Sequence, residues 1–213
     1  MGQIEGAFVT YAEFKDYIAR FVWRDGDTPF EAELDNLIKM GEARLNRDLR
    51  IQRMTKVYVE PLSADEIVLP ADYQELRTVT SSVRPAPLQY VALQELERLR
   101  AAKPNRFLGA YSISGNTIVF AGADAADGRE IRITYYAKVP DFKTDDASWL
   151  ADEYLDLYTY AVLRHTASYL RDDDRVALWQ NEYAETLMSV MDDETKRRFA
   201  GSPLTVRLPG NVA

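Results

Sequence analysis

Two long amphipathic helices are predicted by the C-terminal third of the chain, which reads WLADEYLDLYTYAVLRHTASYL at 149–170, RDDDR at 171–175 and VALWQNEYAETLMSVMDDETKRRF at 176–199. Apolar and aromatic residues recur at steps of three and four on both, so each helix has one face to bury. Asp172, Asp173 and Asp174 fill the corner between them, where carboxylates satisfy the first N–H groups of the second helix and favour its positive end. The two helices are therefore expected to pack as an antiparallel pair.

Two further helices are predicted near the N-terminus. Thr10-Tyr-Ala-Glu13 has the spacing of a capping box, and an apolar stripe follows it until Asp25-Gly26-Asp27 ends the helix. Thr28-Pro29-Phe30-Glu31 repeats this signal, with Thr28 as the N-cap and proline at the first helical position. The second helix should continue to about Arg50.

The middle of the chain changes to the period of β-strands. Short alternating runs predict strands near Val57–Val59, Ile67–Leu69, Leu76–Val83 and Ile131–Tyr135, and Ser114-Gly115-Asn116 predicts a tight hairpin. Leu93, Leu96 and Leu99 mark one short helix among them. Helices at both ends with strands grouped between them predict the α+β class, as a helical bundle with a β-rich insertion.

This pattern divides the chain into four expected parts. They are the N-terminal bundle helices at 1–53, a β-rich region with one short helix at 54–142, the C-terminal helix pair at 143–200 and an extended tail at 201–213.

Composition excludes several classes of site. The 213 residues include no cysteine, which removes disulfides, thiolate metal sites and cysteine nucleophiles. No basic segment followed by an apolar run indicates a signal peptide, and no apolar run approaches the ~20 residues that span a membrane. The formal net charge of -8 disfavours a protein whose task is to grip phosphates, although it permits contact with a passing nucleic acid.

No pattern in the chain carries the signature of an enzyme. Phosphate-binding loops, nucleophile elbows and dinucleotide fingerprints are all missing from the sequence. His165, the single histidine, lies on an apolar helix stripe and is interpreted as a satisfied core or interface residue. The pairs Asp25/Asp27 and Asp124/Asp127 do not follow calcium-loop spacing and are interpreted as turns and caps. We therefore expect no catalytic residue, no metal and no cofactor.

Three features are candidates for contacts with other subunits or proteins. Arg44, Arg47, Arg50 and Arg53 recur at three-residue steps, which suits a solvated helix end, ion pairs in a subunit interface or, less well, a surface that faces DNA. Trp149 and Tyr160 belong to an aromatic surplus that two helices cannot bury alone, and such residues are favoured at interfaces.

The third feature is the C-terminal tail. Leu204, Val206 and Leu208 alternate with polar residues after Pro203, as in a strand that could be added to the edge of another sheet. A frayed terminus is the alternative interpretation of this segment.

Several pieces together resemble the head-to-tail adaptor proteins of tailed bacteriophages. The pieces, in order, are LIKMGEARLNRDLR at 37–50, LPADYQELRTV at 69–79, PLQYVALQEL at 87–96, YSISGNTIVF at 111–120, IRITYYAKVPDF at 131–142 and the pair WLADEYLDLYTYAVL and YLRDDDRVALWQNEY within 149–183. The resemblance covers about residues 30 to 190. One departure is Asp156, near which many relatives are expected to have a proline.

The resemblance implies a structural virion protein at the head-tail interface, assembled in the host cytoplasm and without enzymatic activity. Adaptors of this kind form a homo-oligomeric ring, usually of twelve subunits, which docks on the portal, surrounds a DNA channel and holds a tail or nozzle protein below. By this analogy, the segment with Pro203, Leu204, Val206, Arg207, Leu208 and Val212 is expected to insert into the portal.

Two alternatives from other classes remain open at this point. One is a nucleic-acid-binding packaging or regulatory protein, which would need a clear basic face. The other is a carboxylate-dependent cell-wall hydrolase, which would need two acids converging in a cleft.

Overall fold

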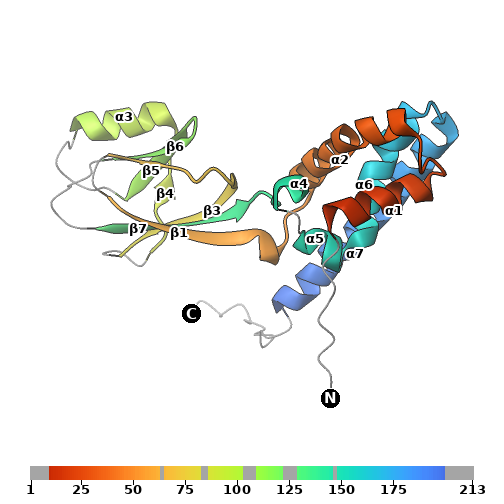
Figure 1. The fold of residues 1–213 in the computed structure, drawn as a ribbon. Helices are drawn as coiled ribbons and strands as arrows, with labels where there is room; N and C mark the ends of the chain where they lie inside the picture. Colours follow the sequence, from red (N-terminus) through yellow and green to blue (C-terminus); the bar gives the residue numbers. More distant parts are fainter. Residues whose placement is uncertain are drawn as a thin grey trace, which may run out of the picture. The chain divides into compact units, whose positions relative to one another are not determined.

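The chain forms two compact units, shown in Figure 1. The computed structural model describes residues 10–62, 65–82, 86–102, 109–121, 129–145 and 148–199. The helical unit consists of the described residues up to Gln52 and from Val139 onward, and the β unit is Arg53–Lys138. The predicted α+β class, with two long C-terminal helices and a β-rich middle, is confirmed.

The first helix, α1 (Tyr11–Phe21), begins at the predicted capping box, because the Thr10 hydroxyl accepts from the Glu13 N–H and the Glu13 carboxylate accepts from the Thr10 N–H. It ends several residues before the predicted Asp25-Gly26-Asp27 stop. The N–H of Arg24 bonds the carbonyl of Ala19 and the N–H of Trp23 bonds that of Arg20, which is a Schellman ending. Trp23 occupies the left-handed position of this motif, with φ of 59°.

The second helix, α2 (Thr28–Asp48), has a different N-cap from the predicted Thr28. The Asp27 carboxylate accepts from the Phe30 N–H, and Glu31 reaches back to the N–H of Gly26, so the whole capping arrangement lies one residue earlier. Thr28 itself is the first helical residue. The helix ends at Asp48, two residues before the predicted end at Arg50.

The C-terminal stretch folds into three helices where two were predicted. α5 (Trp149–Glu153) stops at Tyr154, and α6 (Leu155–Tyr169) begins directly after it. Tyr154 has φ of -135° and ψ of 53°, which interrupts the helical hydrogen bonds, and the Asp156 side chain accepts from the Leu157 N–H in the first turn of α6. The predicted single helix from Trp149 is therefore wrong, and the interruption lies beside the position where a proline was expected.

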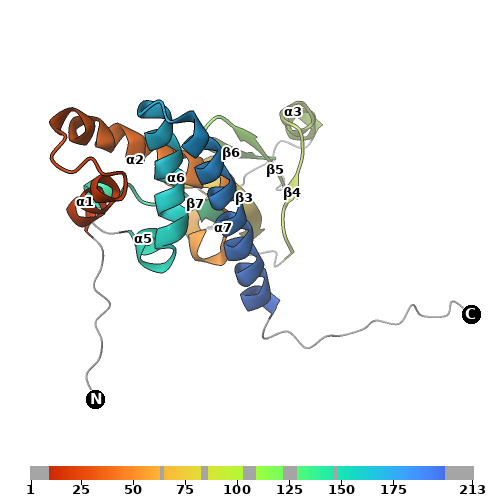
Figure 2. The same cartoon turned by 90° about the vertical axis from the view of Figure 1, so that its right-hand side faces the viewer.

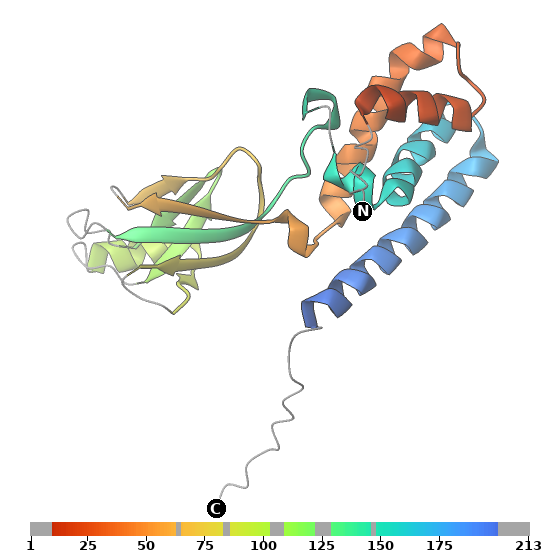
Figure 3. The ribbon, with the colours of Figure 1, turned by 60° about the horizontal axis from the view of Figure 1, so that its bottom comes forward.

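The helix α7 (Asp173–Phe199) follows the acidic corner as predicted, with the Asp172 side chain accepting from the Arg175 N–H. Figure 2 and Figure 3 show α7 running alongside α6 at the border of the helical unit. α6 lies between α2 and α7, and it is buried on more than one face. This explains why apolar and small residues surround most of α6 and not one stripe only.

The centre of the helical unit is aromatic. The rings of Phe14, Phe142 and Tyr158 contact one another at centroid distances of 4.9 to 5.8 Å, and all three side chains are buried. Phe142 belongs to the short helix α4 (Phe142–Asp145). This cluster joins α1, α4 and α6, and its burial contributes strongly to their association because aromatic side chains bury large apolar areas.

The β unit contains two small sheets. The first has the order β1-β7-β3 and is antiparallel, and the second has the order β2-β6-β5-β4, in which only β4 and β5 pair in parallel. The strands are β1 (Thr55–Pro61), β2 (Glu66–Val68), β3 (Tyr73–Ser81), β4 (Gln89–Tyr90), β5 (Ala110–Ser114), β6 (Thr117–Phe120) and β7 (Glu130–Ala137). The short 3-10 helix η1 (Gln52–Met54) precedes β1, and the helix α3 (Leu93–Ala102) lies near β5.

The two sheets share one core. Ile131, Ile133 and Tyr135 alternate inward from β7 and pack with Ile118 and Phe120 of β6. The predicted hairpin is confirmed, since β5 and β6 pair across Gly115, whose φ of 60° suits glycine. On β1 the apolar valines do not face the core. Tyr58 packs on the core, whereas Val57 and Val59 are exposed.

Candidate assembly surfaces

A polar network ties the helices of the helical unit together at one side of the aromatic cluster. The Asp35 carboxylate accepts from the Tyr11 hydroxyl at 3.0 Å and from the ammonium groups of Lys15 and Lys143 at 2.6 Å each. Hydrogen bonds from Lys143, Lys15 and Tyr11 outweigh the effect of partial burial and lower the pKa of Asp35 to about 2. One carboxylate on α2 thus holds α1 and α4 in register.

Glu42, two turns further along α2, makes the second half of this network. Its carboxylate accepts from the Tyr158 hydroxyl at 2.6 Å and from the Phe142 N–H at 3.0 Å. Burial raises the pKa of Glu42 despite these hydrogen bonds, and it also raises the pKa of Tyr158 together with the charge of Glu42. A pocket of about 180 Å³ lies beside the network, lined by residues that include Asp35, Glu42 and Asp141. We interpret the network as a clamp between helices, because its acids are occupied by internal donors.

The predicted arginine series is divided between the two units. Arg44 pairs with Asp48 in its own helix and lies over the Tyr183 ring, 5.5 Å from its centroid. Arg50 donates to the carbonyls of Asn46 and Leu49, so it closes the end of α2. Arg47 is exposed on α2, whereas Arg53 belongs to the β unit. A role of these residues in an interface stays a prediction.

His165 of α6 lies near three arginine side chains. Burial and the charges of Arg164, Arg44 and Arg47 lower its pKa, so the neutral ring is favoured. The ring is half-buried, and its Nε2 atom has no hydrogen-bond partner among the described residues. The predicted location on a packed helix face is therefore right, and satisfaction of the ring by a neighbouring subunit stays a prediction.

The two aromatic candidates lie on different helices of the same unit. Trp149 is half-buried in the first turn of α5. Tyr160 stacks on Trp179 of α7 with centroids 5.9 Å apart and planes at 20°, and Trp179 in turn contacts Phe21 of α1. Tyr160 is thus mostly engaged within its own chain, and its part in a subunit interface remains a prediction.

An acidic groove of about 460 Å³ lies between α7 and the junction of α5 with α6. Five carboxylates line it, from Glu153, Asp156, Glu182, Glu185 and Asp193. All except Glu182 are exposed, so the groove has no enclosed carboxyl group of the kind that a glycosidase uses as its general acid. Its charge makes this flank of α7 repulsive to another acidic surface.

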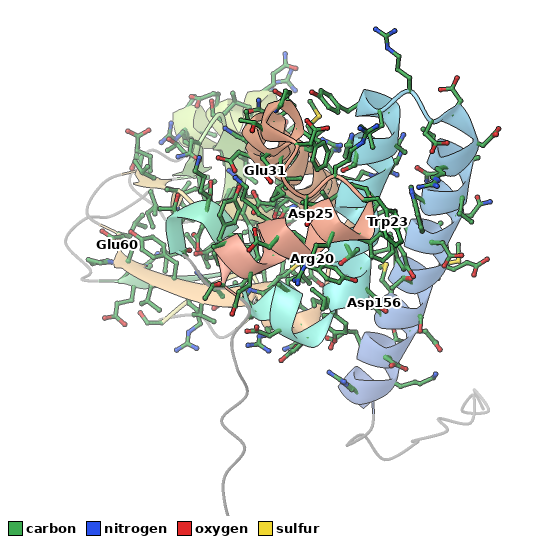
Figure 4. All side chains as sticks on the ribbon, turned by 45° about the vertical axis from the view of Figure 1, so that its right-hand side comes forward. Arg20, Trp23, Asp25, Glu31, Glu60 and Asp156 are labelled. Atoms are coloured by element: carbon green, nitrogen blue, oxygen red, sulfur yellow. The ribbon has the colours of Figure 1, made fainter. Side chains whose placement is uncertain are left out.

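Two uncharged features of the surface were not predicted from the sequence. Trp23, at the end of α1, is 88% exposed, and Figure 4 shows it beside Arg20 and Asp25. Along α7, an uncharged stripe runs through Ala177, Asn181, Ala184, Met188, Met191 and Thr195. The stripe has a four-three-four-three-four spacing in the sequence, and it is separate from the packed face of α7 that contains Trp179 and Tyr183. The sequence around Trp23 contains no pattern that distinguishes an exposed tryptophan from a buried one.

Several predicted positions lie outside the described residues. They are the tail residues Pro203, Leu204, Val206, Arg207, Leu208 and Val212, together with Asp124 and Asp127. Within the described ranges, no group of three or more His, Asp or Glu side chains is placed to hold a metal ion. None of the described helices is both long and apolar enough to cross a membrane.

Comparison with known families accounts for nearly the whole chain. The model of the SU10 adaptor protein family matches residues 9–207, which include the helical unit and the β unit. The chain belongs to the SU10 adaptor protein family. The predicted resemblance to phage adaptors is thereby confirmed, and the protein is a structural adaptor of a bacteriophage. No individually curated protein matches the chain.

This family membership gives the surfaces above their context. An adaptor works through contacts with other proteins, so the exposed apolar groups and charged surfaces are the candidates for these contacts. The buried hydrogen-bond network of Asp35 and Glu42 stabilises the fold of the subunit. Membership also favours a place in the virion.

Proposed function

We propose that this SU10-family adaptor assembles as a ring, of twelve subunits by analogy, on the portal at the head-tail junction. The ring extends the DNA channel and offers a docking surface for a tail or nozzle protein. The observation that carries the proposal is the family match across residues 9–207, which covers both units. Its mechanism is recognition and symmetry, since each subunit contributes one contact to each of two neighbours and ring closure multiplies them.

The charge of the protein fits a channel through which DNA passes without being held. The net charge of -8 disfavours the neutralisation of many phosphates, on which DNA affinity depends. Binding to DNA should therefore be weak and independent of sequence. Near His165, three arginines gather, and Asp48 pairs with Arg44 there, which reduces the net positive charge of this group.

The C-terminal tail is the proposed link to the portal. The alternation of Leu204, Val206 and Leu208 suits a strand added to the edge of a partner sheet. A truncation after Gly201 should therefore abolish portal binding while the two units remain folded. Normal portal binding by the truncated protein would remove this part of the proposal.

The decisive experiment mixes the purified protein with purified portal rings and measures the mass of the complex by sedimentation. One adaptor per portal subunit is expected. If folded protein and intact portal fail to associate, the proposal is wrong, and gel-shift assays and a peptidoglycan turnover assay would then test the nucleic-acid-binding and hydrolase alternatives.

A further inference from the structure

We propose that Trp23 of one subunit packs against the uncharged α7 stripe of the next subunit, and that this pair of surfaces forms the contact between neighbours in the ring. The inference rests on the proposed ring, for which it names the residues. It concerns only the helical unit, which carries both surfaces.

Trp23 is costly to the isolated subunit in two respects. Its φ of 59° places a bulky side chain in the left-handed region, at the position of the Schellman motif where glycine is usual. Its indole is also 88% exposed, so the large apolar area gains nothing from burial. A tryptophan that strains the backbone and packs on little within its own chain is well suited to bury itself in a partner, and tryptophan is among the residues that dominate binding energy.

The α7 stripe is a surface prepared for such a partner. Six positions, spaced four, three, four, three and four apart from Ala177 to Thr195, carry no charge and extend over about 27 Å of helix. Met188 is 72% exposed and Met191 is 39% exposed at its centre. Methionine adapts its shape to a partner and makes favourable sulfur contacts with aromatic rings.

The α7 stripe lies on the side of α7 that faces away from the end of α1. Trp179 of α7 contacts Phe21 at the end of α1, two residues before Trp23. At the pitch of an α-helix, Met188 lies about 180° around α7 from Trp179. The stripe therefore faces away from the α1 corner, so one subunit can present Trp23 to one neighbour and the stripe to the other. This is a head-to-tail contact, the type that closes into rings.

Charge favours this flank of α7 over the other. The acidic groove on the opposite flank would repel a second copy of a chain with net charge -8. No position of the stripe is charged, and its borders carry the exposed acids Glu185, which also lines the groove, and Asp192. Exposed Arg20 and Asp25 flank Trp23. In a second copy, Arg20 beside Trp23 can lie opposite the acids that border the stripe, which favours a second copy as the occupant.

The available area predicts a contact that is weak by itself. A tryptophan buries roughly 150–250 Å², and a helix stripe of this length adds a comparable area, whereas a stable interface buries about 800 Å² per partner. The free protein should accordingly be monomeric at low concentration. Neighbour contacts should then appear as cooperativity when subunits bind side by side on a portal ring.

The experiment titrates portal rings with three full-length variants and counts bound subunits by single-particle mass measurement. Trp23→Gly removes the indole and relieves the backbone, Met188→Glu places a charge in the stripe, and Met40→Glu, at a 49% exposed methionine of α2, is the matched control. Both interface variants should bind the first site with unchanged affinity but lose cooperativity, so that about 30-fold more protein is needed to complete the ring. Met40→Glu should behave as the wild type.

A mixture of the two interface variants tests whether the surfaces meet each other. In the mixture, intact Trp23 of Met188→Glu can pack on the intact stripe of Trp23→Gly, so occupancy should exceed that of either variant alone. Thermal unfolding provides the folding control: Trp23→Gly should melt about 2–4 °C above the wild type, because glycine adopts the left-handed conformation without strain.

Each outcome bears on a separate claim. If the wild type does not bind portal rings, the proposed function fails. If the wild type binds cooperatively and both variants do so equally well, the inference is overturned. If Trp23→Gly weakens the first binding event, Trp23 contacts the portal, which also overturns it. A mixture that merely averages the two variants would show that Trp23 and the stripe do not face each other.

Discussion

The close approach of α2 and α6 at Gly41 yields the sharpest test of the fold. A Cβ atom at Gly41 would lie 2.9 Å from Cγ2 of Val162, 3.2 Å from the N of Val162 and 3.3 Å from the carbonyl carbon of Ala161. Valine in a helix has one strongly preferred rotamer, so its methyl cannot turn away cheaply. The backbone atoms can only yield if α6 moves as a whole. Alanine at this position should therefore separate two packed helices.

The magnitude follows from two opposing effects. Overpacking of a well-filled core costs about 1–3 kcal/mol, and the contact with backbone atoms places Gly41→Ala at the upper end. The higher helix propensity of alanine returns about 1 kcal/mol. The expected net loss is about 1–2 kcal/mol in the free energy of unfolding, measured by urea denaturation followed by circular dichroism.

A double variant separates the clash from other effects. Val162→Ala removes the methyl group at 2.9 Å, so Gly41→Ala should cost at least about 0.5 kcal/mol less in that background than in the wild type. The reasoning is refuted if Gly41→Ala is as stable as the wild type, or if its cost is the same in both backgrounds.

Three further predictions concern charged groups of the helical unit. Asp35→Asn should lower the free energy of unfolding by about 1 kcal/mol at pH 7. The pKa drop from 3.8 to about 2 corresponds to ~2.4 kcal/mol, and the partial exposure of both lysines reduces this value. In urea titrations, the difference in stability from the wild type should shrink as the pH falls from 3.8 toward 2. The raised pKa of Glu42 means that its contribution is present below pH 4.5 and is lost as the pH rises through the folded-state pKa. Glu42→Gln should flatten this pH dependence in thermal melts, and an unchanged profile would contradict the assignment. Arg47→Ala should weaken ring assembly and its salt sensitivity if the exposed guanidinium forms an ion pair between subunits, and unchanged titrations at 50 mM and 500 mM salt would exclude that role.

Local signals predicted the elements well where one short stretch contains all the interacting groups. The capping box of Thr10 and Glu13 and the hairpin at Gly115 are of this kind, since their hydrogen bonds join residues a few positions apart. The two errors in the helix boundaries have different causes. Asp27 and Thr28 are both good N-caps, and only the backbone conformation decides between them. The interruption at Tyr154 occurs in a stretch without glycine or proline, so no strong helix breaker marks it in the sequence.

The candidate surfaces were harder to predict than the elements. Arg44, Arg47, Arg50 and Arg53 share a sequence spacing, but Arg44 and Arg50 are occupied inside the helical unit and Arg53 lies in the other unit. Trp23 illustrates the opposite error, because an apolar residue after a helix suggests burial, whereas this side chain is exposed. Exposure depends on what the rest of the chain covers, and spacing along the sequence contains little of that information.

The sequence by itself determined the α+β class and the order of most helices and strands, because periodicity, caps and turn residues act over a few positions. The resemblance to phage adaptors rests instead on the ordered set of matching sequence pieces, and the family match confirmed it. Only the tertiary structure decided that α6 is enclosed by α2 and α7, that Asp35 and Glu42 are used as internal clamps, and that Trp23 and the α7 stripe remain uncovered. These outcomes depend on contacts between residues far apart in the sequence, such as Glu42 and Tyr158, which are 116 positions apart. Such contacts exist only once the helices have packed.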